Sequence, residues 1–136
     1  MLISSKEKLK NIQPLIDAFA LLGGRLYVEE FFPRSIFRVE LLDGTQRLSQ
    51  IVPKSHSGIC FAFWEGYIEI RRLHVNINRR NTGLSKALLA PLIKYGETNN
   101  VLKFKVASAN DSFWEHIQDT YRQIAWEVLR DSIADD

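Results

Sequence analysis

A short basic segment with one glycine holds the residues in this sequence that best suit chemistry. The segment covers residues 79–85 and reads Arg-Arg-Asn-Thr-Gly-Leu-Ser. It places two guanidinium groups, a glycine and a hydroxyl where we expect a helix to start. Free backbone N–H groups and the positive end of a helix dipole favour a phosphate at such a place. Gly83 would let the backbone approach that phosphate closely because glycine has no Cβ.

The strand expected before this turn carries a change of parity. Its apolar residues are Ile68 and Ile70, followed by Leu73 and Val75. A two-residue period cannot change faces without an extra residue. We therefore predict a β-bulge near Arg71 or Arg72, just ahead of the basic turn.

The turn and its flanking strand resemble motif A of the GCN5-related N-acetyltransferase (GNAT) superfamily. That motif is Gln/Arg-x-x-Gly-x-Gly/Ala after a strand ending in Val. Here residues 80–85 read Arg-Asn-Thr-Gly-Leu-Ser, Val75 lies five residues before the arginine, and Ser85 stands where the family prefers Gly or Ala. Residues 101–114 (VLKFKVASANDSFW) resemble the next strand of the family and its Asn-containing helix start. The resemblance extends over residues 60–116.

This resemblance implies that the chain binds acetyl-CoA (coenzyme A). The pyrophosphate would lie on the amides of Thr82–Ser85 with help from the arginines, and the pantetheine arm would lie along the bulged strand end. The thioester would fit between that strand and the strand of residues 102–107 if the two splay. The cofactor-binding residues implied in this way are Leu73, Val75, Arg79, Arg80, Asn81, Thr82, Gly83, Leu84, Ser85, Asn110 and Trp114.

Amine acetylation also needs a base, because the attacking nitrogen must lose a proton. Glu69 lies where members of the family often carry a glutamate, although it equally suits a solvent-facing residue paired with Arg71. His74 is the alternative base, although a lone strand histidine is more often structural. Tyr121, on the expected last helix, is the candidate to protonate the departing thiolate.

Two functions stay open at this point. The first is an N-acyltransferase that moves an acetyl group from acetyl-CoA to a primary amine, on a small molecule or a peptide. The second is a non-catalytic GNAT-fold binding or regulatory protein that keeps the coenzyme A cleft or only its shape. Residues 120–131 have helical spacing, so the last strands of the family are expected to be missing or to come from another subunit. Acceptor pockets of the family come from variable loops and helices, so we expect the segments of residues 12–24 and 53–58 to form the acceptor pocket here.

The order of expected elements predicts an α/β (α+β) fold with a GNAT-like mixed central β-sheet flanked by helices, in a single compact domain over residues 1–136. We expect a helix over residues 4–19 that kinks or divides at Pro14, and a crossover helix from residue 84 that is kinked by Pro91. The expected strands cover residues 25–32, 35–42, 59–64, 67–76 and 102–107. The last two should be parallel because a helix joins them.

Composition excludes several other classes. Among 136 residues, 46% are hydrophobic and 25% charged, and the formal net charge is +2. No segment has the apolar length of a signal peptide or a membrane span, so a cytoplasmic location is the default. The near-neutral balance argues against a nucleic-acid partner despite the local arginines.

Cysteine and histidine content bears on metals and partners. Cys60 is the single cysteine, which excludes an internal disulfide and a thiolate zinc site, and it reads as a buried structural thiol. The three histidines lack metal-ligand spacing, so no metal is expected. An unfinished sheet edge after Ala107 would suit a partner strand, which makes a homodimer an expectation.

Overall fold

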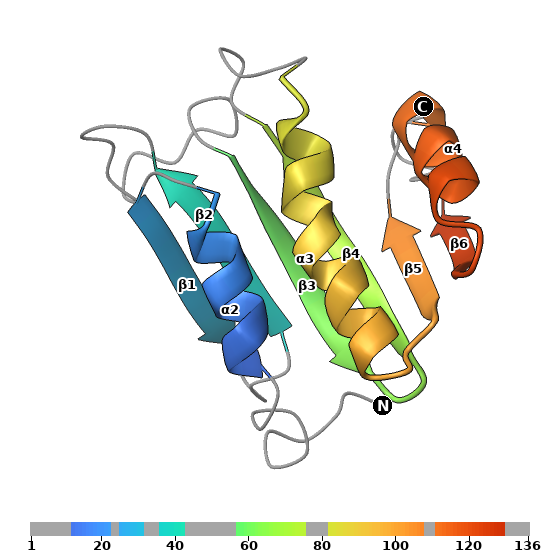
Figure 1. Cartoon of the computed structure of the whole chain (residues 1–136), viewed down its shortest axis with the longest axis horizontal. Helices are drawn as coiled ribbons and strands as arrows, with labels where there is room; N and C mark the ends of the chain where they lie inside the picture. The colour runs from blue at the N-terminus through green and yellow to red at the C-terminus, as the bar shows by residue number, and fades with distance from the viewer. Residues whose placement is uncertain are drawn as a thin grey trace.

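The computed structural model describes residues 12–22, 25–31, 36–42, 57–75, 82–107 and 111–129. Six strands form one mixed sheet whose spatial order equals the chain order, and three described helices pack on it (Figure 1). The elements in chain order are α2 (Ile12–Ala20), β1 (Arg25–Phe31), β2 (Ile36–Leu42), β3 (Ser57–Trp64), β4 (Tyr67–His74), α3 (Leu84–Thr98), β5 (Lys103–Ala107), α4 (Asp111–Thr120) and β6 (Ala125–Leu129).

The sheet changes from antiparallel to parallel at β4. Strands β1 to β4 pair antiparallel with their neighbours, and the turn between β3 and β4 has Gly66 at φ 84°. Strand β4 then pairs parallel with β5 through the crossover helix α3, and β5 pairs parallel with β6 through α4. The five expected strands and the parallel crossover are therefore confirmed. The protein has the expected α/β (α+β) fold, a mixed central sheet with helices packed on it.

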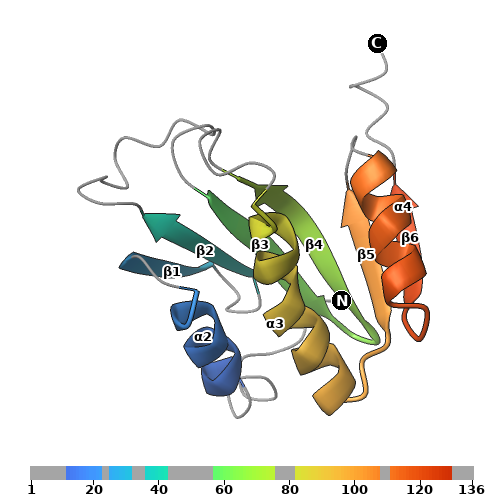
Figure 2. The ribbon, with the colours of Figure 1, turned by 45° about the horizontal axis from the view of Figure 1, so that its top comes forward.

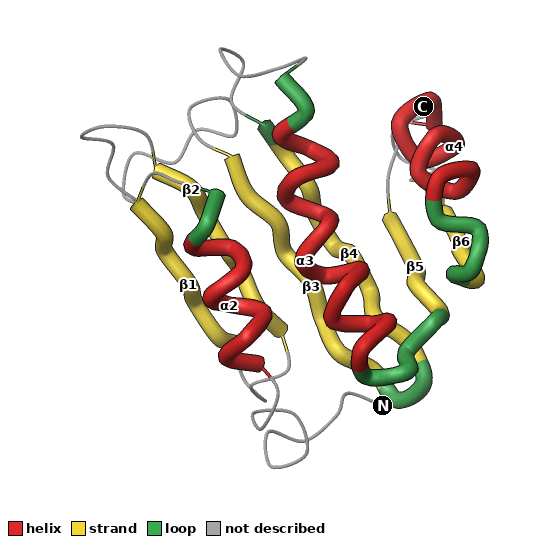
Figure 3. Tube along the Cα trace, viewed as in Figure 1, coloured by secondary structure: helices red, strands yellow, loops and turns green. Residues whose placement is uncertain are grey.

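All three described helices cover the same face of the sheet, as Figures 2 and 3 show. The alternating residues of the strands explain this arrangement, since one parity is apolar and the other largely polar. The apolar parity joins the helices in one core, whose members include Phe19, Phe37, Phe61, Ile70, Leu92, Phe104 and Ile117. We call the opposite side, to which Arg38, Glu40, Cys60, Glu69 and His74 belong, the outer face. No described helix packs on the outer face.

Both described helices that were expected to contain a proline do contain it. Helix α2 covers Ile12–Ala20 and includes Pro14, while residues 4–11 of the expected first helix lie outside the described residues. Helix α3 continues from Leu84 to Thr98 with Pro91 inside it. Near its end, Gly96 is buried, and an added Cβ would lie 2.7 Å from the carbonyl oxygen of Val101. Glycine at this position therefore lets α3 lie close to the segment that leads into β5.

A β-bulge interrupts β4, as its change of parity predicts. Ile70 lies opposite Phe61 and Arg72 opposite Cys60, which leaves Arg71 as an extra residue on β4. The apolar residues before and after the bulge consequently face the same core. Arg71 and Arg72 are both exposed.

The end of the chain corrects one expectation. Residues 121–129 do not continue the predicted helix, because α4 ends at Thr120 and β6 occupies residues 125–129, while residues 130–131 lie outside the described residues. Trp126 and Val128 pack on the core while Ala125, Glu127 and Leu129 are exposed, which is the period of a strand. The helical spacing misleads because a turn followed by a short strand can reproduce it. Strand β6 also covers the edge of β5, so the sheet does not end after Ala107.

Candidate functional site

Strands β4 and β5 stay paired over only part of their length. Within the described parts of the two strands, the parallel register joins Ile68 with Phe104, Glu69 with Lys105 and Ile70 with Val106. β4 continues past this point to His74, through the bulge at Arg71. Strand β5 ends at Ala107, so among the described residues the carboxyl-terminal half of β4 has no pairing partner on this side. Ligands of open α/β sheets bind in crevices at the carboxyl ends of strands.

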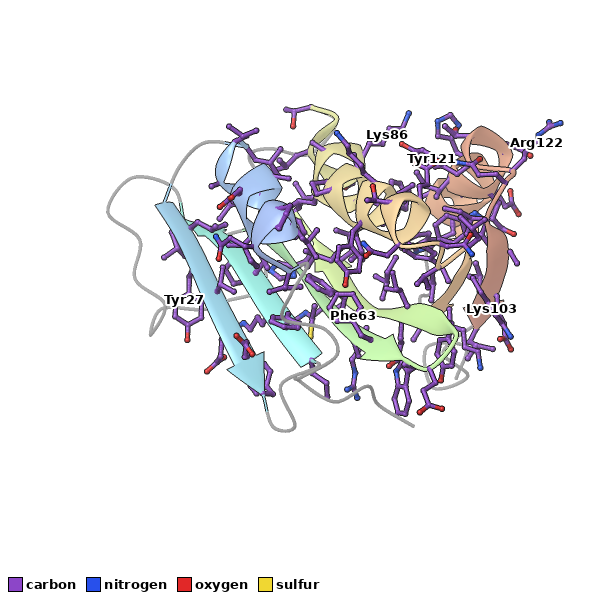
Figure 4. The ribbon with its side chains drawn as sticks, turned by 60° about the horizontal axis from the view of Figure 1, so that its bottom comes forward. Tyr27, Phe63, Lys86, Lys103, Tyr121 and Arg122 are labelled. Atoms are coloured by element: carbon purple, nitrogen blue, oxygen red, sulfur yellow. The ribbon has the colours of Figure 1, made fainter. Side chains whose placement is uncertain are left out.

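Helix α3 begins beside this edge, at Gly83. The φ of Gly83 is 83°, in the left-handed region, and its carbonyl accepts the first helical hydrogen bond, from the N–H of Ala87 at 3.0 Å. The N–H groups of the three residues between them point out of the helix start. A Cβ added to Gly83 would meet no atom of the described residues within 4 Å. Thr82 and Lys86 are exposed, and Figure 4 shows Lys86 on α3.

Several residues of the motif cannot be placed. Arg79, Arg80, Asn81 and Asn110 lie outside the described residues. The structure thus describes the glycine half of the turn and leaves the basic half undescribed.

The apolar candidates for cofactor binding point toward the core. Leu73 and Val75 pack against the cluster that contains Leu84 and Leu88 of α3, so only their backbone groups could contact a ligand. Trp114 is 3% exposed and lies within the core. Its ring centroid is 6.1 Å from that of Trp126 on β6.

Glu69 lies on the outer face, where β4 is still paired with β5. One of its carboxylate oxygens accepts a hydrogen bond from Nε1 of Trp64 at 2.8 Å and lies 3.9 Å from Nε of Arg71. Glu69 therefore lies beside Arg71 on the same strand. The indole of Trp64 is a further partner of Glu69, which the sequence does not indicate.

His74 contacts a carboxylate that the sequence analysis did not single out. Its Nε2 lies 3.0 Å from Oε2 of Glu40, whose side chain is only 3% exposed. The other oxygen of Glu40 accepts a hydrogen bond from Nε of Arg38 at 3.1 Å, and Arg38 in turn lies 3.6 Å from Glu29. The sequence feature that points to Glu40 is its position beside Arg38 on the face of residues 35–42 that alternates with the apolar Phe37 and Val39.

These side chains line a pocket on the outer face, which we call the outer-face pocket. Its volume is about 560 Å³. Its lining residues are Phe31, Arg38, Glu40, Cys60, Arg71, Arg72 and His74. The pocket thus lies on strands and not on the segments where the sequence analysis expected an acceptor site. Burial raises the pKa of the Cys60 thiol, against the opposing effect of the nearby arginines.

Tyr121 is not brought to this region. Its N–H donates to the carbonyl of Ile117 at the end of α4, and four residues later the N–H of Ala125 donates to the carbonyl of Leu102, just before β5. His74 lies at the opposite end of the parallel pair, roughly 20 Å away at ~3.3 Å per strand residue. Figure 4 shows Tyr121 beside α4. The tyrosine, the histidine and the motif glycine therefore do not form one site.

Comparison with known proteins adds little to this geometry. No family model and no curated protein matches the sequence. Among solved structures, the chain is similar to a candidate acyl-CoA N-acyltransferase from Klebsiella pneumoniae, with a TM-score of 0.47 and 13% identity over 88% of this chain and 78% of that one. It is also similar to a tetramutant of the BH1408 protein from Bacillus halodurans, with a TM-score of 0.31 and 20% identity over 70% of this chain and 54% of that one. Similarities at this level support no inference about function.

No helix in the described part of the chain has the length and apolar character needed to cross a membrane. The His, Cys, Asp and Glu side chains of the described residues form no group of three that could hold a metal ion.

Proposed function

We propose that this protein is a GNAT-like N-acyltransferase that moves an acetyl group from acetyl-CoA to a primary amine. One observation supports this most: within the described parts of the two strands, the register of β4 with β5 extends no further than Ile70 and Val106, beside a bulge and the start of α3. An open strand edge next to a helix start offers backbone groups to an extended arm and to a phosphate at once.

The residues of the turn fit a diphosphate. The amides of Thr82–Ser85 would bind its oxygens, and a Cβ on the left-handed Gly83 would meet no atom of the described residues within 4 Å. Arg79 and Arg80, which follow β4 in the sequence, would add charge-assisted hydrogen bonds. The backbone of residues 73–75 would hold the pantetheine arm. Bound acetyl-CoA would supply an activated acyl thioester.

The attacking amine must lose a proton, and His74 is the candidate that lines the outer-face pocket. The neighbouring carboxylate of Glu40 would stabilise the imidazolium that forms when His74 takes that proton. Glu69 is the alternative base, one residue before the end of the β4–β5 pairing. We do not assign a role in proton transfer to Tyr121, because it lies at the far end of the sheet.

A non-catalytic, acyl-CoA-binding protein is the second candidate, and specific contacts favour it. Nδ1 of His74 is buried and its Nε2 faces Glu40. Glu69 is likewise engaged, by Trp64. A protein of this kind would bind acetyl-CoA without producing free thiol when amines are added.

Thermal unfolding with acetyl-CoA tests both candidates. Binding to the native state alone at 100 times Kd adds about 2.7 kcal/mol, which corresponds to a rise of roughly 8 °C in Tm. An unmoved Tm would contradict both candidates. Release of free thiol with an amine panel then separates the enzyme from the binding protein.

A pair of glycine variants locates the ligand. Gly83→Val should abolish the rise in Tm, because the side chain would occupy the space above the helix start. Gly66→Val is the matched control, since Gly66 has nearly the same φ, 84° against 83°, and equally open surroundings, but lies in the β3–β4 turn. Both variants should lose similar stability, while only the first loses the response. An equal response in the two variants would place the ligand elsewhere.

A further inference from the structure

We propose that the outer-face pocket binds the acceptor, and that the acceptor is a small amine that also carries a carboxylate or phosphate group. This inference rests on the acyltransferase function proposed above. It adds the substrate class and the residues that would select it.

The position of the pocket on β4 is the first argument. Beyond the bulge, successive residues of β4 alternate between the two faces of the sheet. Leu73 packs toward α3, while Arg72 and His74 line the outer-face pocket. The pocket therefore lies across β4 from the helix start that would hold the diphosphate. A thioester along the open strand edge and an amine in the pocket would meet at that edge.

The charge of the pocket is the second argument. Among the described residues, three guanidinium groups and one carboxylate line it. Arg38 is held by Glu29 and Glu40, and Arg71 approaches Glu69 only to 3.9 Å. Arg72 is exposed, and among the described residues no carboxylate forms an ion pair with it. A planar guanidinium fork at a pocket mouth suits a carboxylate or phosphate, which it can bind through two parallel hydrogen bonds.

The size and the inner end of the pocket complete the argument. A volume of about 560 Å³ suits a small molecule. Glu40 and His74 are more buried than Arg71 and Arg72, so the buried end of the pocket carries a carboxylate and an imidazole and its exposed end carries guanidinium groups. An amine with an acid group matches this polarity, with its nitrogen toward His74 and its acid toward Arg72.

The reaction in this arrangement balances without a further reagent. The amine nitrogen forms a bond to the acyl carbon, and the bond from that carbon to sulfur breaks. Starting from an ammonium group, the nitrogen loses two protons, of which one ends on the thiol and one passes to solvent. The acid group of the acceptor takes no part beyond its contact with the arginines.

Binding measurements with paired amines test this inference. The probes are O-phosphoethanolamine against ethanolamine, and β-alanine against β-alaninamide, titrated calorimetrically into the protein with and without coenzyme A. At least one acidic amine should bind more than tenfold tighter than its neutral partner. Which pair shows the difference tells whether the site prefers phosphate or carboxylate.

Arginine variants connect that binding to the pocket. Arg72→Gln should weaken binding of the acidic amine about tenfold or more, because a hydrogen bond to a charged group is lost. Its rise in Tm with acetyl-CoA should be unchanged. Arg122→Gln is the matched control, since Arg122 is exposed on the turn after α4, away from the pocket (Figure 4). It should bind like the unmodified protein.

The outcomes separate this inference from the proposed function. If acetyl-CoA raises Tm but no acidic amine binds better than its neutral partner, the substrate class is wrong and the acyltransferase function stands. If the acidic amine binds Arg72→Gln as tightly as the unmodified protein, the outer-face pocket is not its site. If the acidic amine binds and acetyl-CoA has no effect on Tm, the acyltransferase function fails and the acceptor role fails with it.

Discussion

His74 and Glu40 come within 3.0 Å of each other although strand β3 separates them in the sheet. Both residues are register partners of Gly58, Glu40 on one side and His74 on the other. Neighbouring strands lie about 4.8 Å apart, so the two backbones are about 10 Å apart. The side chains can meet above β3 because the residue between them has no Cβ.

We expect Gly58→Ala to destabilise the protein. The added Cβ would collide with the carboxylate of Glu40 and lie 2.5 Å from the carbonyl oxygen of Val39. Overpacking of this kind costs about 2 kcal/mol in the free energy of unfolding, which urea denaturation would measure. In a Glu40→Ala background the cost should fall by about 1 kcal/mol, because only the backbone clash remains. An equal cost in both backgrounds would show that Glu40 does not occupy the space above Gly58.

Glu40→Gln should lower the free energy of unfolding by about 2 kcal/mol. The carboxylate is buried and accepts a hydrogen bond from Arg38 while contacting His74, and hydrogen bonds to charged groups are worth about 1.5–3 kcal/mol. Glu30→Gln is the matched control, because Glu30 is exposed on β1 and should change stability by less than about 0.5 kcal/mol. Equal effects of the two substitutions would mean that the buried contacts of Glu40 contribute nothing.

The features that the sequence predicts correctly depend on neighbouring residues. The alternation of apolar and polar residues predicts β2, and the change of parity among the apolar residues of β4 predicts the bulge at Arg71. Both patterns follow from the two-residue period of a strand. The contact between Glu40 and His74 joins residues 34 positions apart. It depends on the register of two strand pairs across Gly58, which no local pattern contains.

The misread end of the chain has a different cause. Steps of three and four residues between residues 117 and 128 fit a helix, but they also fit a turn followed by a short strand. The parallel partner for that strand is β5, whose edge would otherwise be open, and such tertiary pairing overrides local spacing. The outer-face pocket was missed for a similar reason, because its residues come from four different strands.

The pairing of β6 with β5 can be tested by hydrogen exchange. The amide of Ala125 donates to the carbonyl of Leu102 at 2.7 Å and should exchange slowly, whereas an unpaired end would exchange at once. Trp126→Phe should weaken this protection and cost about 1 kcal/mol, because the indole N–H donates to the carbonyl of Tyr121 at 3.0 Å. Trp64→Phe removes an indole donor from the β3–β4 hairpin and is the control. Trp64→Phe should leave the exchange rate of the Ala125 amide unchanged. Fast exchange of that amide in the unmodified protein would contradict the pairing of β6 with β5.

The thiol of Cys60 should react slowly in the native protein. Burial raises its pKa above the ordinary 9.0, although the guanidinium groups of Arg71, Arg38 and Arg72 act in the opposite direction. Because the thiolate is the nucleophile, alkylation by iodoacetamide at pH 8.5 should be several times slower in the native protein than in urea. Removing one cation by Arg71→Gln should slow it further.

The raised pKa of Cys60 also determines whether the free energy of unfolding rises or falls with pH. Well below pH 9.0 the thiol is protonated in both states, so there it contributes no pH dependence. Above pH 9.0 the unfolded chain loses this proton more readily than the native protein, so the contribution to stability falls as pH rises through the native pKa. Cys60→Ser should flatten the fall in Tm over this alkaline range.

The alkylation rate of Cys60 has an outcome that would contradict the prediction. Alkylation as fast in the native protein as in urea would show a thiol activated by the arginines of the outer-face pocket, and Arg71→Gln would then slow the reaction most.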